Sequence, residues 1–334
     1  MIFVTGATGF LGSYLVKNLI SNGETVRALK RSTSNFKLLG DFAKDVNWVE
    51  GDVLDIPSLE NAMDGAEKVY HCAGIFAAGR EREKGMAINA EGTANVFNIA
   101  LDKKVKKLVH VSSTIALGLP LNGQVIDENY YVPTDKLMFD YFKSKRQAEL
   151  EAWRAHAEGL EVVIVNPGGL LGAGMWSTEP LNTFQVVYNG LSFYTEGSNA
   201  FADVRDASEI MVRLMNSEVN GERFILISEN IPIKDYLNRV ADELKVKRPK
   251  YRLTNTLGQL AWRYEGIKSI FTGTKPSFTK DDLTIARIPF QYSNSKVVEV
   301  TGFKFRPLAQ TIHDTALSFL ESKKKNLNFG TFTN

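Results

Sequence analysis

The stretch Thr5-Gly6-Ala7-Thr8-Gly9-Phe10-Leu11-Gly12 joins a short apolar run at residues 2–4 to a helical pattern at residues 9–20. Glycines at a strand-to-helix junction permit a tight turn and let the backbone approach a ligand closely. The start of the helix then offers free N–H groups and positive potential to a pyrophosphate. A purely structural turn is the alternative. We interpret the segment as a dinucleotide-binding loop, with cofactor-binding residues Gly6, Thr8, Gly9, Phe10, Leu11 and Gly12.

The same strand-to-helix unit repeats through the first half of the chain. Strands are predicted at residues 2–4, 25–29, 46–49, 68–72, 108–111 and 162–165, with helices at 9–20, 55–63, 84–101 and 136–156. This alternation predicts an α/β fold with a Rossmann-type, doubly wound parallel sheet. A helix at 206–215 and a strand at 223–227 are expected to return to that sheet.

The chain therefore divides into two predicted parts. Residues 1–166 and about 202–228 form the dinucleotide-binding domain, residues of about 167–201 and 229–325 form a smaller, mostly helical substrate lobe, and residues 326–334 form a flexible tail. The C-terminal segment 253–271 carries an apolar stripe at helical spacing, which indicates a packing face, with a lid or a helix on a membrane surface as the alternatives.

Composition excludes several classes of protein. The 334 residues include 40 Lys and Arg against 38 Asp and Glu, a formal net charge of +2, and 44% hydrophobic residues. The hydrophobic content excludes a disordered chain, and the net charge lacks the strong positive excess that is typical of a nucleic-acid-binding protein. The single cysteine, Cys72, excludes a disulfide framework, and no spacing of ligands predicts a metal. With no membrane span or export signal in the sequence, we expect a cytoplasmic protein.

The end of the second predicted strand indicates which dinucleotide binds. Residues 27–32 read RALKRS and contain no carboxylate, whereas a site for NAD(H) commonly has an acidic residue there for the ribose hydroxyls. Arg31, supported by Lys30, would bind a 2′-phosphate by charge-assisted hydrogen bonds. NADP(H) is therefore the expected cofactor and NAD(H) the alternative. A further alternative is that these basic residues are simply solvated at the strand end and bind no phosphate.

After the third strand, Asp52-Val53 is expected to contact the adenine, while Asp55 is expected to cap the next helix; capping by Asp52 is the alternative.

A Tyr-x-x-x-Lys pair places both side chains on one helical face, where an ammonium group favours the phenolate and lowers the pKa of the tyrosine. Three pairs have this spacing: Tyr141/Lys145, Tyr264/Lys268 and Tyr292/Lys296. Only Tyr141 follows a strand that ends in hydroxyl residues, Ser112-Ser113-Thr114, so we assign proton transfer to this pair and expect surface roles for the other two. Ser113 is the predicted catalytic hydroxyl, with Ser112 and Thr114 as alternatives.

Taken together, these motifs resemble the extended short-chain dehydrogenases/reductases. The resemblance covers about 230 residues and rests on residues 5–12, Asp52, HCAG at 71–74, NAEGT at 89–93, Ser112-Ser113, Tyr141 to Lys145 and NPG at 166–168. It implies that Ser113, Tyr141 and Lys145 are catalytic. It also implies that Tyr141, Lys145, Ala73, Gly74, Pro167 and Gly168 contact the cofactor, Lys145 at the nicotinamide ribose and Pro167-Gly168 near the carboxamide.

Family resemblance also implies a homodimer formed by the 84–101 helix and the Tyr-Lys helix, with Leu137, Phe142, Leu150 and Trp153 at the contact.

Within the superfamily, residues 26–31, 201–207 and 272–276 resemble the dihydroflavonol reductase and hydroxysteroid dehydrogenase group. Nucleotide-sugar epimerases usually have a tyrosine four places after the catalytic serine, where this chain has Leu117. We therefore expect a reductase of a small or apolar ketone or aldehyde, acting on a carbonyl or, in reverse, an alcohol. A nucleotide-sugar epimerase/dehydratase with retained NAD(P) and a non-catalytic NADP(H) sensor are the alternatives.

Apolar side chains are expected to line the substrate crevice, although many residues of this kind belong to ordinary core. The expected substrate-binding residues are Phe76, Thr114, Met138, Leu170, Phe184 and Tyr188. His71 and His110 occur in or beside core strands, so we interpret both as structural.

Overall fold

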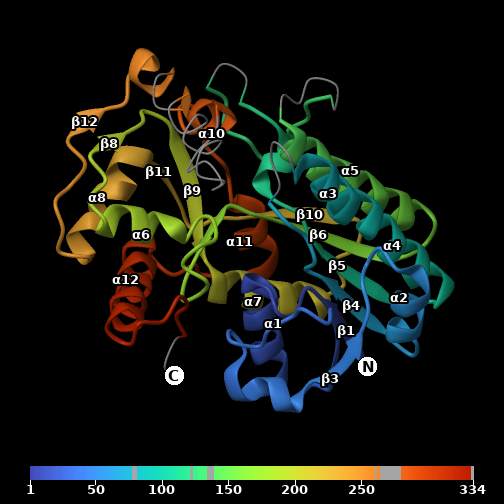
Figure 1. The fold of residues 1–334 in the computed structure, drawn as a ribbon. Helices are drawn as coiled ribbons and strands as arrows, with labels where there is room; N and C mark the ends of the chain where they lie inside the picture. Colours follow the sequence, from blue (N-terminus) through green and yellow to red (C-terminus); the bar gives the residue numbers. More distant parts are fainter. Residues whose placement is uncertain (77–80, 121–122, 134–138, 260–261, 264–279, 332–334) are drawn as a thin grey trace.

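A seven-stranded parallel sheet lies at the centre of the computed structural model, which describes residues 1–76, 81–120, 123–133, 139–259, 262–263 and 280–331 (Figure 1). Its order is β10-β6-β5-β4-β1-β2-β3. The strands are β1 (Ile2–Thr5), β2 (Val26–Lys30), β3 (Asn47–Glu50), β4 (Lys68–His71), β5 (Lys107–Val111), β6 (Glu161–Pro167) and β10 (Glu222–Leu226). The order reverses between β1 and β4, which is where ligands bind in open α/β sheets.

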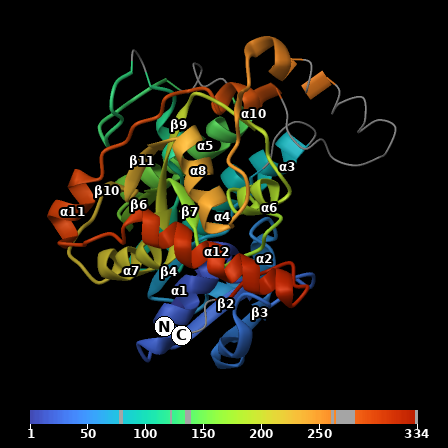
Figure 2. The same cartoon turned by 90° about the vertical axis from the view of Figure 1, so that its left-hand side faces the viewer.

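Alternating side chains along the strands build two hydrophobic layers. In β1, Ile2 and Val4 pack with α1 (Phe10–Ser21) and α7 (Val204–Met215), while Phe3 points to the opposite face. That face is covered by α2 (Ile56–Met63), α4 (Gly92–Asp102) and α5 (Asp140–Ala157), as Figures 1 and 2 show. The apolar strands and amphipathic helices thus form the predicted doubly wound fold.

The predicted helix at 84–101 is divided into three pieces. α3 (Arg82–Met86) leads into a π-helical turn (Ala87–Glu91), and α4 follows. Wider turns of this kind appear at functional sites, where they change the direction of a side chain. Here the turn contains Asn89, which is buried.

The second part of the molecule combines helices with two small sheets. A three-stranded sheet has the order β11-β9-β7, and a two-stranded sheet pairs β12 with β8. Their strands are β7 (Gly169–Leu171), β8 (Phe193–Tyr194), β9 (Ser198–Asp203), β11 (Glu229–Pro232) and β12 (Tyr251–Arg252). The helices are α6 (Asn182–Tyr188), α8 (Ile233–Glu243), α10 (Lys280–Ile285), α11 (Ser295–Thr301) and α12 (Leu308–Lys324).

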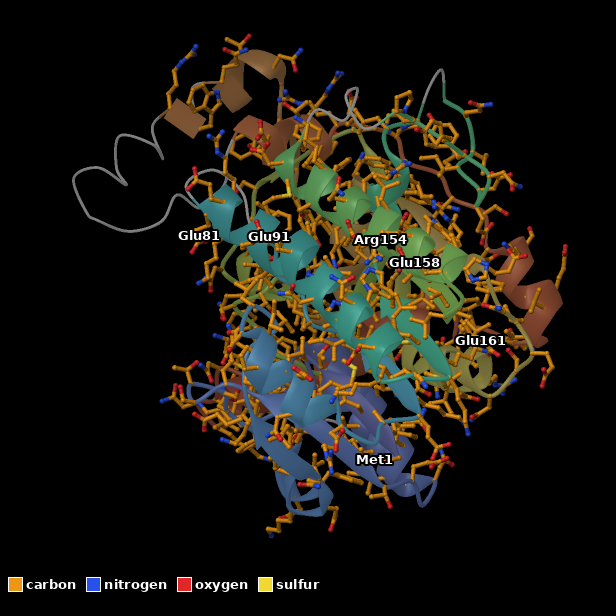
Figure 3. All side chains as sticks on the ribbon, turned by 90° about the vertical axis from the view of Figure 1, so that its right-hand side faces the viewer. Met1, Glu81, Glu91, Arg154, Glu158 and Glu161 are labelled. Carbon is orange, nitrogen blue, oxygen red and sulfur yellow. The ribbon has the colours of Figure 1, made fainter. Side chains whose placement is uncertain are left out.

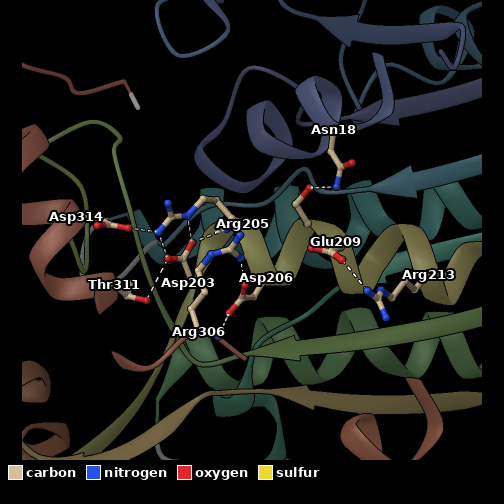
Figure 4. A network of polar contacts seen from close by, with 10 residues as sticks. Asn18, Asp203, Arg205, Asp206, Glu209, Arg213, Arg306, Thr311 and Asp314 are labelled. Atoms are coloured by element: carbon tan, nitrogen blue, oxygen red, sulfur yellow. Dashed lines mark hydrogen bonds and ion pairs between the residues drawn. The ribbon is translucent and has the colours of Figure 1, made fainter. Parts of the chain in front are cut away.

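Partly buried ion pairs join the start of α7 to the C-terminal segment (Figure 4). Arg205 contacts Asp203 at 2.6 Å and Asp314 of α12 at 2.7 Å. Arg306 pairs with Asp206, whose side chain is inaccessible to solvent. Because an unpaired buried carboxylate is costly, these arginines hold the second part of the molecule against α7.

The C-terminal residues 326–331 are not the free tail that their composition predicts. The Trp176 N–H donates to the carbonyl of Asn328 at 3.1 Å, and the Gly330 N–H donates to the carbonyl of Gly174 at 2.8 Å. Backbone hydrogen bonds do not depend on side-chain identity, so the residue pattern could not predict that this segment is held in place.

Among the described residues, no helix is long and apolar enough to cross a membrane.

Candidate active site

The carboxyl ends of the parallel strands meet at one edge of the sheet. Strand register aligns Thr5 with His71 and His71 with His110, so the loops that follow β1, β4 and β5 are neighbours. The predicted cofactor segments at 6–12, 73–74 and 167–168 and the predicted catalytic Ser113 all follow strands at this edge. These candidate cofactor and catalytic segments therefore lie at the same edge of the sheet.

Steric contacts explain the glycines of the first loop. Gly6 has φ of +70°, and a Cβ there would lie 2.5 Å from the Ala73 nitrogen. A Cβ on Gly12 would lie 2.2 Å from the Gly6 carbonyl oxygen. α1 begins after Gly9 with no side-chain cap and no acidic residue in its first turn. Its uncapped N–H groups fit the pyrophosphate of a dinucleotide.

A cavity of about 520 Å³ lies beyond β2 and β3, lined by Arg31, Ser32, Thr33, Glu50, Gly51, Asp52, Asp55 and Ser58. The Arg31 side chain is exposed and forms no ion pair with any residue that the structure describes. Lys30, in contrast, pairs with Glu50 of the adjacent strand at 3.2 Å. Residues 27–32 contain no carboxylate, but β3 supplies one beside Lys30.

Asp52 and Val53, expected near the adenine, and Asp55, expected to cap the next helix, have different surroundings. The Asp52 carboxylate accepts the Leu54 N–H at 3.0 Å and borders the cavity. Asp55 occupies the N-cap position of α2, but its side chain makes no capping hydrogen bond, so the expected cap was wrong. Val53 is buried, and a Cβ on Gly92 would lie 2.7 Å from its methyl group. The Val53 side chain thus contributes to the core beneath the cavity.

Two predicted catalytic side chains are anchored at the end of β5. Ser113 begins a 3-10 turn (Thr114–Leu117), where its Oγ accepts the Ile115 N–H at 3.5 Å. Lys145 is one helical turn after Tyr141 on α5, and its Nζ donates to the Val111 carbonyl at 3.3 Å. Contacts of α5 with the end of β5 therefore bring the lysine beside the serine-bearing turn.

Burial controls the ionisation of the pair. It raises the pKa of Tyr141 to about 12 and lowers the pKa of Lys145 to about 8, while Glu149 and Cys72 raise the lysine pKa. The expectation that Lys145 lowers the tyrosine pKa is not met in this structure, because desolvation dominates. Tyr141 consequently keeps its proton near neutral pH.

Asn89 joins the segment after β4 to α5. Its Oδ1 accepts the Ile75 N–H at 2.8 Å, and its Nδ2 donates to Ser144 Oγ at 3.1 Å. Ser144 Oγ in turn donates to the Tyr141 carbonyl at 2.8 Å. A Cβ on Gly74 would lie 3.0 Å from Lys145 Nζ. In the sequence, Asn89 belongs to the NAEGT motif at 89–93, with backbone hydrogen bonding around the helix as the alternative role.

The predicted substrate residues do not form one group. Phe76 is half-exposed and packs edge-on against Tyr141 at 4.7 Å between ring centroids, while Leu170 packs partly buried beside β9. Phe184 is wrongly placed in the prediction, since it is buried in a core with Trp176.

Tyr188 is exposed and packs on Phe319 of α12. Met138 lies outside the described residues, as does most of the 253–271 stripe, including the Tyr264/Lys268 pair.

Tyr292 corrects another expectation. It was predicted to be a surface residue, but it is buried and its hydroxyl is hydrogen-bonded to the Thr114 side chain, next to Ser113. Lys296 pairs instead with Glu222 at 2.5 Å. The local sequence could not predict the contact between Tyr292 and Thr114, because the two residues are far apart in the chain.

Both strand histidines are structural, as predicted. His71 Nδ1 lies 2.7 Å from Thr5 Oγ1, and its Nε2 lies 2.9 Å from Thr93 Oγ1. Burial lowers the pKa of His71 to about 3 and that of His110 well below its usual value, so both rings are neutral. Within the described part of the chain, no three acidic, histidine or cysteine side chains gather as a metal site.

The predicted dimer contacts differ in their exposure. Leu150 is exposed on the outer face of α5, whereas Phe142 is buried against Phe139 and Trp153 is covered by the Arg223 guanidinium. Leu137 lies outside the described residues. Phe142 was therefore wrongly expected at a surface, because its side chain faces the interior of the subunit.

A family model described as the NAD dependent epimerase/dehydratase family matches residues 2–226. The chain is 31% identical over 323 residues to a protein of Synechocystis sp. named "Putative dihydroflavonol 4-reductase", covering 93% of this chain and 92% of that protein. It is also 26% identical over 337 residues to cinnamoyl-CoA reductase 1 of Petunia hybrida, covering 96% and 92% of the two chains.

Solved structures show the same architecture. The crystal structure of gox2253 has a TM-score of 0.83 and 27% identity, with 96% of this chain and 98% of that chain covered. UDP-glucose 4-epimerase of Thermotoga maritima has a TM-score of 0.78 at 18% identity, with 96% and 99% covered. At 18% identity, the similarity to UDP-glucose 4-epimerase shows a shared fold and nothing about function.

Proposed function

The chain belongs to the NAD-dependent epimerase/dehydratase family of extended short-chain dehydrogenases/reductases, and we propose that it reduces a small or apolar ketone or aldehyde with NADPH. The observation that carries this proposal is the position of Ser113 and Lys145 at the end of β5, with Tyr141 one turn before the lysine on α5. The relatives named as reductases support reduction as the chemistry.

Several features support NADP(H) as the cofactor. The uncapped start of α1 suits the pyrophosphate, and the exposed Arg31 at the mouth of the 520 Å³ cavity suits a 2′-phosphate. Asp52 at the same cavity is proposed to contact the adenine. Ala73, Gly74, Pro167 and Gly168, at the ends of β4 and β6, are proposed to contact the nicotinamide half. The chemistry that this cofactor supplies when bound is hydride transfer.

Each catalytic side chain has a proposed role in carbonyl reduction. Tyr141, which is protonated near neutral pH, donates a proton to the carbonyl oxygen. The Ser113 hydroxyl donates a hydrogen bond to the same oxygen and orients it. The Lys145 ammonium stabilises the negative charge left on Tyr141 and is proposed to hold the cofactor ribose.

An apolar substrate is supported by the surroundings of Tyr141. Phe76 presents a half-exposed aromatic ring against it. In the sequence, Leu117 stands at the position where nucleotide-sugar epimerases usually have a tyrosine. Arg205, which could bind a sugar diphosphate, is instead paired with Asp203 and Asp314.

We also propose a cytoplasmic homodimer with its contact on the outer face of α4 and α5, which run side by side in Figure 3. Leu150 is exposed there, and Arg154 links Glu158 to Asn98 across the two helices. The division into a cofactor domain and a substrate lobe at the boundaries given above is part of the same proposal.

The test is NADPH oxidation with a panel of ketones and aldehydes. The proposal expects turnover of at least one apolar carbonyl and none of UDP-sugars. Cofactor retained through purification, with interconversion of a sugar nucleotide and no net NADPH consumption, would favour the epimerase/dehydratase alternative. NADPH binding without any turnover in the panel would favour a sensor.

A further inference from the structure

One buried carboxylate beside the catalytic residues is not used by the proposed reaction. Glu149 lies one helical turn after Lys145 on α5, and its side chain is inaccessible to solvent. Removing a carboxylate from water costs several kcal/mol unless partners compensate it, so a buried Glu at this position requires an explanation.

Its partners connect it to the serine. Asn166, at the end of β6, donates from Nδ2 to Glu149 Oε1 at 2.5 Å and to the Ser113 carbonyl at 2.9 Å. Arg223 of β10 lies 3.3 Å from the other carboxylate oxygen. A single amide therefore joins the carboxylate on the catalytic helix to the backbone of the predicted catalytic serine.

We propose that Glu149 and Asn166 are positioning residues: Glu149 is the buried counter-charge of the Lys145 ammonium, and Asn166 holds the Ser113 turn in register with it. This inference rests on the proposed carbonyl reduction for its catalytic meaning. The charge relation itself does not depend on which substrate is bound.

The other titratable groups around Lys145 carry no negative charge near neutral pH, so the effect of Glu149 on the lysine pKa can be measured separately. From β4 the lysine faces His71 and Cys72, and from β5 it faces His110; the two rings are neutral, and burial raises the pKa of the Cys72 thiol to about 12. Near neutral pH none of these groups is an anion. Glu149 then supplies the negative charge that opposes the desolvation of Lys145.

The remaining charged neighbours lie on the other side of the carboxylate. Arg146 is coupled electrostatically to both Glu149 and Arg223, and its Nε donates to the Ala116 carbonyl at 2.7 Å. Tyr141, on the first turn of α5, is protonated near neutral pH. Glu149 thus lies one helical turn from the lysine on one side and 3.3 Å from Arg223 on the other, and Arg146 adds a further positive charge near it.

The test is the titration of Lys145 in the cofactor-free protein, followed by NMR of ¹³Cε-labelled lysine and assigned with Lys145→Arg. Glu149→Gln keeps the acceptor for Asn166 but removes the charge, so the Lys145 midpoint should fall by about one pH unit. Glu149→Asp should restore a midpoint close to that of the unmodified protein. Glu151→Gln is the matched control, because Glu151 pairs on the surface with Arg154 and should leave the midpoint unchanged.

A midpoint that is the same in Glu149→Gln and the unmodified protein would overturn the counter-charge role. If Glu149→Gln does not fold, Glu149→Asp and Glu149→Asn can be compared instead. Their side chains are one methylene shorter, and they differ from each other in charge as Glu and Gln do. Asn166→Ala should lower kcat about tenfold or more while NADPH affinity stays the same, because the serine turn loses its anchor. Unchanged kcat would overturn the Asn166 role. Failure of the carbonyl assignment would appear in the substrate panel and not in the lysine titration.

Discussion

Replacing Arg31 by Asp should convert a binding site for NADPH into one that rejects it. The guanidinium is exposed at a cavity of about 520 Å³ and has no ion pair among the described residues, so the change removes no described side-chain contact. A charge-assisted hydrogen bond to a phosphate is worth about 1.5–3 kcal/mol. An aspartate about 4 Å from that phosphate adds roughly 1 kcal/mol of repulsion per charge in water. The sum of about 3 kcal/mol corresponds to roughly a hundredfold weaker binding of NADPH.

The assay is calorimetric titration of the protein with NADPH and with NADH. NADH affinity should be nearly unchanged in Arg31→Asp, since NADH has no 2′-phosphate. Lys37→Asp makes the same charge change at an exposed residue that does not line the cavity, and should bind NADPH normally. Raising the salt concentration should weaken NADPH binding to the unmodified protein more than to Arg31→Asp. Equal NADPH affinity of Arg31→Asp and the unmodified protein would refute the assignment.

Two further predictions concern stability. Gly12→Ala should lower the free energy of unfolding by about 1–3 kcal/mol, because the new Cβ would lie 2.2 Å from the Gly6 oxygen; urea unfolding measures this, and an unchanged midpoint would contradict it. Because burial lowers the pKa of His71 to about 3, the unfolded state binds more protons between pH 6.5 and pH 3. Stability should therefore fall as the pH decreases through that range, by about 1.4 kcal/mol per pH unit for His71 alone. His110→Leu should make this slope shallower; the same slope in both proteins would show that His110 is not buried in its neutral form.

Local patterns were enough to place candidate residues that belong to single strand ends. The glycine loop, Arg31 and Ser113 each follow an apolar run, and a parallel sheet brings the ends of such runs to one edge. The fold class and the edge that carries the crevice could be inferred for that reason.

Contacts between distant segments could not be inferred in this way. Asn166 joins Glu149 and Ser113 through the relative placement of β5, β6 and α5, and Tyr292 reaches Thr114 from far along the chain. Phe184 illustrates the opposite error: an apolar residue after the sheet suits a crevice and a core equally well, and only packing against Trp176 decides between them.

The central claim is that Tyr141 transfers the proton in an NADPH-dependent carbonyl reduction. The most direct measurement compares NADPH consumption by Tyr141→Phe and the unmodified protein, with a carbonyl compound that the unmodified protein reduces, alongside the NADPH dissociation constant of each. Tyr141→Phe should lose at least about a hundredfold in kcat, because the proton donor is gone, while NADPH affinity is retained. Full activity in Tyr141→Phe would contradict the account.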